Sequence, residues 1–447
     1  MTTQRTLHLN AFLNNVGHHE AAWRLPESDP FGGDEVEFYV RLARTAEAAK
    51  LDSIFFADAP VVWGDAGLRP ASMLEPTVLL AAIAVATERI GLIATASTTY
   101  NDPYNLARRF AAVDHISHGR AGWNIVTTAS ESAAHNFGLD GIAAHAERYE
   151  RAREFIEVVT KLWDSWTDDA VLGDKAGGLW ADPAKVRAIN HEGKFYRVRG
   201  PLNAQRSPQG YPVLVQAGSS LDGRILAGDY AEAVFTAQRT LAEGKAFYTD
   251  LKQRAVSAGR REHDIVILPG IVPYLGSTEA EARAREEEFN EVINPAHGLR
   301  QISEMFGFDL TGAELDAPLP DVPEEDEIET HKSRAVLITK LARDENLTVR
   351  QLLGKLGGGR GHRTFTGTPE QLADDLQEWF EGGAADGFNI MPAAYPADFE
   401  TFTEHVVPIL QKRGLFRSEY EGATLREHYG LERPRDSLAA ELAELAA

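Results

Sequence analysis

Hydroxyl, amide and carboxylate side chains recur directly after short apolar runs of this sequence. Asp58 follows one such run, and Gln-Ala-Gly-Ser-Ser ends another at residues 216–220. Gly218 permits a close backbone approach, and Ser219 and Ser220 add hydroxyls to the free N–H groups of a helix start, which together could cradle a phosphate. The same residues also fit plain structural roles, because Asp and Ser are favoured helix caps and glycine suits a tight turn.

A second group of polar residues lies farther along the chain. Asn124 and Thr128 lie near the end of another apolar run. His145 and Tyr149 are four residues apart, so they share one face of a helix. With Arg148 they could contact a polar ligand. The alternative is a surface histidine beside a half-buried tyrosine.

A metal site is not indicated. His18, His19 and Glu20 are adjacent, so their side chains diverge, and no other cluster has the helical spacing of metal ligands such as H-E-x-x-H. We therefore predict no bound metal. His18 could instead act as an acid or base, or orient a substrate, because its unperturbed pKa is close to neutrality.

Two other sequence patterns do not indicate catalysis. The glycine-rich run at 354–361 has no strand before it and matches neither the Rossmann fingerprint nor a Walker loop, so we interpret it as a flexible hinge. The G-x-S-x-G elbow of serine hydrolases is absent.

Composition excludes several classes of protein. The chain has 447 residues, no cysteine and a formal net charge of −22. Without cysteine there is no disulfide, thiolate nucleophile, Cys-ligated zinc or iron–sulfur cluster. An acidic chain is a poor nucleic-acid binder. The longest apolar run, residues 78–86, is about half a membrane span, and the start lacks a signal-peptide apolar region. We expect a cytoplasmic protein that binds neither nucleic acid nor membrane.

The elements that position these residues alternate between strand and helix. Eight apolar, strand-like runs occur, most of them followed by a helical pattern, which indicates βαβ units and a parallel sheet. Eight such units predict a closed (β/α)₈ TIM barrel, with an open doubly wound sheet as the alternative. The eight runs are residues 7–13, 53–57, 90–95, 121–127, 212–217, 233–236, 264–268 and 387–391.

Two stretches interrupt this repeat. Residues 164–207 read as a loop insertion with a small hairpin near 194–198, and residues 278–363 read as a helical excursion with helices at 279–291 and 333–341. Insertions of this length tend to form lids or oligomer contacts. We expect a single domain over residues 1–447 that contains both insertions.

Together these features describe a polar cleft at the rim of a barrel. It has a phosphate cradle at a helix start, several hydroxyls and amides, one carboxylate, and no thiol. A flavin mononucleotide (FMN) site needs such a phosphate cradle, an apolar slot for the ring, and a dry cavity that protects a reactive oxygen adduct.

The chain resembles a known family over nearly its whole length. Its ordered motifs are similar to those of bacterial-luciferase-like flavin monooxygenases, in the nitrilotriacetate and dibenzothiophene-sulfone monooxygenase subgroup. The motifs include residues 9–12 (Leu-Asn-Ala-Phe), 55–58 (Phe-Phe-Ala-Asp), 94–100 (Ala-Thr-Ala-Ser-Thr-Thr-Tyr), 119–127 (Gly-Arg-Ala-Gly-Trp-Asn-Ile-Val-Thr), 148–149 (Arg-Tyr), 216–220 and 424–427 (Thr-Leu-Arg-Glu).

The resemblance implies a two-component monooxygenase. A separate NAD(P)H:FMN reductase would supply reduced FMN, O₂ would add at flavin C4a, and the resulting peroxide would oxidise a small organic substrate at a C–N or C–S bond or by S- or N-oxygenation. It also implies a homodimer or homotetramer. The implied FMN contacts are Asp58, Thr95, His145, Tyr149, Ser219 and Ser220, next to Gly218, with Ser97 and Asn124 as second choices.

The chain departs from the alkane-oxidising members at two positions. Asn15 stands where they carry a cysteine, and Thr128 stands where they carry a histidine. An alkane substrate is therefore disfavoured, and His18, Asn15 and Thr128 are our predicted catalytic residues. Two other functions stay open, a deazaflavin-dependent oxidoreductase of the same fold and a non-catalytic flavin-binding protein.

Overall fold

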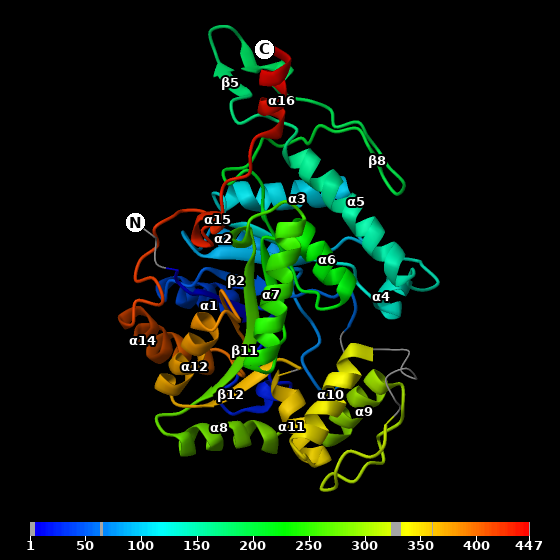
Figure 1. The fold of residues 1–447 in the computed structure, drawn as a ribbon, viewed down its shortest axis with the longest axis vertical. Helices are drawn as coiled ribbons and strands as arrows, with labels where there is room; N and C mark the ends of the chain where they lie inside the picture. The colour runs from blue at the N-terminus through cyan, green and yellow to red at the C-terminus, as the bar shows by residue number, and fades with distance from the viewer. Residues whose placement is uncertain (1–4, 63–65, 323–331, 360, 447) are drawn as a thin grey trace.

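Eight parallel strands close into a barrel at the centre of the molecule (Figure 1). The structure is a computed structural model that describes residues 5–62, 66–322, 332–359 and 361–446. The strands are almost entirely buried, as expected where helices cover a parallel sheet. In order around the barrel they are β1 (His8–Leu13), β2 (Ser53–Phe56), β3 (Gly91–Ser97), β4 (Ala121–Val126), β9 (Val213–Gln216), β10 (Ala233–Thr236), β11 (Val266–Leu275) and β13 (Gly387–Ile390).

Closure of this sheet decides between the two predicted architectures. The last strand, β13, pairs in parallel with β1, and β10 pairs with β11, so no strand of the ring of eight is left at an edge. The predicted (β/α)₈ barrel is confirmed, and the open doubly wound sheet is excluded.

Helices surround the barrel, and several begin at polar caps. Asp102, Ser220, Thr240 and Thr368 each accept a hydrogen bond from the backbone N–H three residues later. Around the barrel lie α1 (Val36–Ala48), α2 (Pro76–Ala84), α3 (Pro103–Ile116), α4 (Glu131–Asn136), α5 (His145–Trp163), α6 (Leu221–Tyr230), α7 (Leu241–Ser257), α12 (Pro369–Glu381), α13 (Ala397–Thr401) and α14 (Val407–Lys412). None of the helices in the described residues combines the length and apolar character that a membrane span requires.

A short C-terminal helix, α15 (Leu425–His428), closes the amino end of the barrel. Leu425 packs against β3 and β4, where a Cβ on Gly91 would lie only 2.4 Å from one of its methyl carbons. Tyr429 reaches the barrel interior and donates a hydrogen bond to Asn10 Oδ1 at 3.0 Å. Because this end is filled, a ligand site has to lie at the carboxyl ends of the strands.

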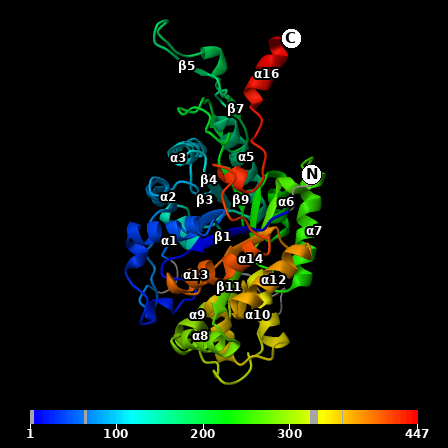
Figure 2. The same ribbon diagram turned by 90° about the vertical axis from the view of Figure 1, so that its left-hand side faces the viewer.

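The insertion at 164–207 folds into two small hairpins. β5 (Val171–Asp174) pairs with β6 (Leu179–Ala181), and β7 (His191–Glu192) pairs with β8 (Arg197–Val198). The second hairpin confirms the one expected near 194–198, whereas the first was not predicted. Both extend to the same end of the molecule as the C-terminal helix α16 (Ser437–Ala446) (Figures 1 and 2).

The insertion at 278–363 is a helical layer beside the barrel (Figure 1). The two predicted helices are confirmed as α8 (Glu279–Glu291) and α10 (Lys332–Asp344), and two more, α9 (Pro295–Phe306) and α11 (Val349–Gly359), were missed. The layer has its own apolar core, which includes Leu299, Ile302, Phe306, Ile338, Leu341 and Leu352. The next strand, β12 (Arg363–Gly367), adds to β11 outside the ring of eight.

The glycine-rich run at 354–361, of which residue 360 lies outside the described residues, is not a hinge up to residue 359. Its first residues form the end of helix α11. A Cβ on Gly358 would lie 2.2 Å from the Tyr274 hydroxyl oxygen of β11, and a Cβ on Gly357 would lie 3.3 Å from His19 Nε2. The hinge interpretation was wrong because these glycines serve close packing of a helix on the barrel.

Candidate functional site

A cluster of polar side chains lies where β9 passes into α6 and faces the start of α5. Ser220 caps α6 and accepts a hydrogen bond from the Gly223 N–H at 3.2 Å. The Tyr149 hydroxyl lies 3.5 Å from the Ser220 hydroxyl. His145 stacks at a tilt on Tyr149, with ring centroids 4.8 Å apart, and pairs with Asp222 of α6 at 2.9 Å. The structure thus brings three predicted ligand residues together, His145, Tyr149 and Ser220, and the predicted Ser219 lies exposed next to Ser220 in the chain.

Arg148, which precedes Tyr149 on α5, adds a buried positive charge at this rim. Its side chain comes from the first turn of α5, and the residue is only 8% exposed. Its Nη1 donates to the Thr127 carbonyl at 3.4 Å, and its Nε has no hydrogen-bond partner among the described residues. A guanidinium in this position needs an anion, because burying an unpaired charge is costly. The sequence placed Arg148 beside His145 and Tyr149 as a contact for a polar ligand, although it was not among the implied FMN contacts.

Two predicted residues meet inside the barrel on neighbouring strands. Asn124 Nδ2 donates to Thr95 Oγ1 at 2.8 Å, and Thr95 Oγ1 donates to the Phe56 carbonyl at 2.9 Å. Asn124 is 2% exposed, and its Oδ1 has no partner in the described part of the chain. A buried amide oxygen without a donor is rare in folded proteins, so it indicates a missing donor such as a ligand N–H or an ordered water.

Ser97 and Thr128 form a second hydroxyl pair nearer the rim. Thr128 Oγ1 donates to Ser97 Oγ at 2.8 Å, and the Thr99 N–H donates to the same oxygen at 3.1 Å. This pair joins the ends of β3 and β4. Thr128 is therefore engaged in positioning these two strand ends as well as standing at the predicted catalytic position.

Asp58 follows β2 on the neighbouring side of the rim. Burial and the nearby carboxylate of Glu75 raise the pKa of Asp58 to about 6. Opposing these effects are a hydrogen bond from the Ala59 backbone and the charge of Arg109. Carboxyls with such raised pKa values cluster at functional sites, although structural pairs also produce them.

The two remaining predicted residues lie in the loop after β1. Asn15 has a positive φ of 39° and accepts a hydrogen bond from the Tyr39 hydroxyl at 3.5 Å. His18 is 1% exposed, its Nε2 lies 2.6 Å from the Phe12 carbonyl oxygen, and its ring packs edge-on against Phe12. In this structure both side chains hold the shape of the loop, so a role in catalysis stays a prediction for each.

Together these residues form a site at the carboxyl end of a barrel with a polar cradle for an anion and polar groups beneath it. The described residues contain no group of three or more His, Asp or Glu side chains that could hold a metal ion. The orphaned Asn124 oxygen and the buried Arg148 fit a ligand that carries both an N–H donor and a phosphate, which describes a flavin nucleotide. A closed (β/α)₈ barrel with such polar groups at the carboxyl ends of its strands has the form of a barrel enzyme.

Comparison with known proteins assigns the family. Residues 14–386 match the family model described as luciferase-like monooxygenase, and the chain belongs to that family. It is 48% identical to nitrilotriacetate monooxygenase component A of Aminobacter aminovorans, over 98% of this chain and 99% of that one. It is 46% identical to N-acetyl-S-(2-succino)cysteine monooxygenase of Bacillus subtilis (strain 168), over 96% and 98%.

Solved structures agree with this assignment. EDTA monooxygenase from Chelativorans sp. BNC1 superposes with a TM-score of 0.80 at 38% identity, and the match covers 96% of this chain and 99% of that one. The resemblance stated from the sequence is therefore confirmed. The protein is an enzyme, a flavin-dependent monooxygenase.

Proposed function

We propose that this chain is the oxygenase component of a two-component system. It would take reduced FMN from a separate NAD(P)H:FMN reductase and use O₂ to oxidise a small organic substrate. The observation that carries this proposal is the cradle of Tyr149 and Ser220 beside the buried, underpaired Arg148. Hydroxyls at a helix start and a guanidinium are groups that bind phosphate strongly.

The residues divide between the two ends of the flavin. Ser219, Ser220 and Tyr149 would hold the phosphate with the help of Arg148. Asn124 would accept a hydrogen bond from the flavin ring edge through the oxygen that now lacks a donor. When bound, reduced flavin would supply the two electrons that activate O₂, so that one oxygen atom could oxidise the substrate while the other leaves as water.

The relatives support the reaction class and the need for a partner. Their names give nitrilotriacetate and EDTA, which are amines, and a succinylated cysteine, which is a thioether. Each of these molecules contains C–N or C–S bonds, which supports oxidation at such a bond as the reaction of this chain. One relative is named as component A, which supports a second component that delivers the reduced flavin.

Binding of reduced FMN without oxygen tests the proposal. The double variant Ser220→Ala with Tyr149→Phe should bind reduced FMN at least tenfold more weakly, because each hydrogen bond to a charged group contributes about 1.5–3 kcal/mol. Thr240→Ala is the matched control, since Thr240 caps α7 away from the cradle. With NADH and a flavin reductase present, oxygen uptake should require FMN.

Two results would contradict the proposal. One is binding of a deazaflavin in preference to reduced FMN. The other is tight binding of oxidised FMN with no reaction of the reduced form with oxygen, which would indicate a flavin-storage protein.

A further inference from the structure

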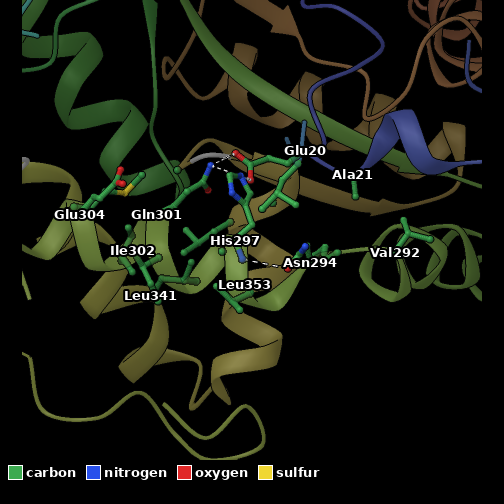
Figure 3. A pocket seen from close by; sticks show the side chains of 18 of the residues that line it. Glu20, Ala21, Val292, Asn294, His297, Gln301, Ile302, Glu304, Leu341 and Leu353 are labelled. Atoms are coloured by element: carbon green, nitrogen blue, oxygen red, sulfur yellow. Dashed lines mark hydrogen bonds and ion pairs between the residues drawn. The ribbon is translucent and has the colours of Figure 1, made fainter. Parts of the chain in front are cut away.

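A cavity of about 240 Å³ lies on the same face of the barrel, between the helical insertion and the loop after β1 (Figure 3). Its wall includes Glu20 and Trp23 from that loop, Leu68 from the loop after β2, and Arg239 from the loop after β10. The candidate flavin site is built from the cradle at the end of β9 and the start of α5, with polar groups from the ends of β3 and β4. The cavity therefore occupies the other part of the rim that the cradle leaves open.

Most of the wall of this insertion cavity is apolar. The insertion contributes Val292, Ile293, Ile302, Ile338, Leu341 and Leu353. Ile302 is 2% exposed in the apolar core of the insertion. A ligand that fills this space gains chiefly from the burial of its own apolar surface, at roughly 25 cal/mol per Å².

The carboxylate of Glu20 in the cavity wall already has hydrogen-bonding and charged partners. Glu20 Oε1 accepts hydrogen bonds from Gln301 Nε2 at 3.0 Å and from Arg69 Nη1 at 3.4 Å, and its Oε2 lies 3.6 Å from His297 Nε2. Figure 3 shows Glu20, Gln301 and His297 directed toward one another. These contacts neutralise the carboxylate, so it does not call for a cationic ligand.

Two hydrogen-bond donors on the loop after β1 could still bind an acceptor of a ligand. The indole N–H of Trp23 is buried and has no acceptor among the described residues. Arg24 donates through Nη1 to the Val292 carbonyl, which is the one bond that the described residues provide for its guanidinium. Arg239, in contrast, pairs with Glu345 at 3.0 Å. The cavity thus offers hydrogen-bond donors for an acceptor oxygen and little charge to balance several carboxylates.

We propose that the insertion cavity binds the substrate of this monooxygenase, and that this substrate has an apolar skeleton with one acceptor group, such as a sulfone, a carbonyl or a single carboxylate. This inference rests on the proposed function. A polycarboxylate such as nitrilotriacetate does not match the cavity, because each additional buried carboxylate without a partner is costly. The substrate class thus differs from that named for the 48%-identical relative.

Two probes of opposite character test the class directly. Dibenzothiophene sulfone is a rigid apolar molecule with acceptor oxygens, and nitrilotriacetate is a compact polyanion. Both are titrated by calorimetry into the protein, without flavin and then with reduced FMN under anaerobic conditions. The sulfone should bind saturably with a Kd below about 1 mM, and nitrilotriacetate should show no saturable binding in the same range.

Three variants locate the binding. Ile302→Trp fills the cavity and should weaken sulfone binding at least tenfold, whereas Ala296→Trp, at an exposed position of the same helix, should stay within twofold of the wild type. Trp23→Phe removes the donor while keeping an aromatic ring at this position and should weaken sulfone binding about fivefold to tenfold. This variant keeps the test valid should Ile302→Trp fail to fold.

The outcomes separate this inference from the proposed function. Reduced FMN affinity is measured on the same proteins and should not change in Ile302→Trp or Trp23→Phe. If the wild type failed to bind reduced FMN, the proposed function would fail while the sulfone titration still reported on the cavity. Absent sulfone binding, sulfone binding that neither Ile302→Trp nor Trp23→Phe weakens, or nitrilotriacetate binding that Ile302→Trp abolishes would each overturn the substrate class.

Discussion

Arg148 is the residue on which recognition of the flavin phosphate can be tested most directly. It is buried, its Nε lacks a partner among the described residues, and its Nη1 makes only a long hydrogen bond, of 3.4 Å, to the Thr127 carbonyl. We expect Arg148→Met to weaken reduced FMN binding by about 10- to 100-fold, because a charge-assisted hydrogen bond to phosphate is lost.

Reduced riboflavin, which has no phosphate, provides the internal comparison. Its affinity should change less than threefold in Arg148→Met, so discrimination between the two flavins should shrink. Arg153→Met is the matched control on the same helix, since Arg153 pairs with Asp229 on α6. Equal losses for FMN and riboflavin would instead assign Arg148 a structural role.

Ionisation of Asp58 destabilises the folded protein, so the stability of the protein should depend on pH. The pKa of Asp58 is raised to about 6 from its usual 3.8. The unfolded chain therefore loses its proton at lower pH than the folded chain does, and the contribution of Asp58 to stability falls as pH rises from about 4 to 6. Above pH 6 the penalty is complete.

Asp58→Asn removes this titration. At neutral pH the variant should therefore be more stable than the wild type. The melting temperature of the variant relative to wild type should rise between pH 4.5 and pH 7, on the order of 2 °C. Differential scanning calorimetry of both proteins at the two pH values checks this. Parallel pH dependences of the two melting temperatures would show that Asp58 keeps an ordinary pKa.

At the scale of elements, α11 is held on the barrel by a glycine contact. A Cβ at Gly358 would lie 2.2 Å from the Tyr274 hydroxyl oxygen, and Tyr274 is buried in β11. Gly358→Ala should therefore destabilise the protein by about 1–3 kcal/mol, as overpacking does, and should raise the rate of proteolysis within the insertion.

The neighbouring glycine is the control for helix propensity. A Cβ at Gly359 meets only Thr364 Cγ2, at 3.3 Å. Gly359→Ala should be neutral or stabilising by up to about 1 kcal/mol, because alanine favours the helix. If both variants behaved alike in melting temperature and proteolysis, the close packing of α11 would not depend on Gly358.

The sequence predicts those helices and strands whose own residues show a clear apolar pattern. All eight barrel strands were found because each is a continuous apolar run. Strand β12, Arg-Thr-Phe-Thr-Gly, was missed because it is half-polar and adds at the edge of β11. Helix α11 was misread because glycine usually breaks helices, and only the neighbouring Tyr274 shows why glycine is needed there.

The candidate site divides in the same way. The cradle of Tyr149 and Ser220 was predictable because each residue lies at a strand end or helix start, where a barrel gathers its ligands. The insertion cavity was not, because Glu20 meets Gln301 across 281 residues of sequence, and no local pattern signals that contact. The unpaired oxygen of Asn124 likewise becomes visible only once its neighbours are placed.

At the scale of the whole molecule, the barrel separates stability from chemistry. Its amino end is filled by Leu425 and Tyr429, and its carboxyl end carries the cradle and the insertion cavity. With this arrangement, the loops at the carboxyl end can differ in sequence without disturbing the packed core at the amino end. A substitution at the filled end should thus change stability while leaving flavin binding intact.

Leu425→Ala tests that separation. Leu425 is fully buried and packs against Gly91 and Gly122. Because glycine has no side chain that could move into the space, Leu425→Ala should leave a cavity and lower the free energy of unfolding by about 2–5 kcal/mol. The melting temperature should fall by several degrees, whereas reduced FMN affinity at a temperature below the transition should stay within twofold. Tyr149→Phe should do the reverse, with weaker flavin binding and a nearly unchanged melting temperature, since its hydroxyl contacts the Ser220 hydroxyl at the rim. If Leu425→Ala also weakened flavin binding severalfold, the two ends of the barrel would be coupled through the strands that join them, and the filled end would have to be counted as part of the functional site.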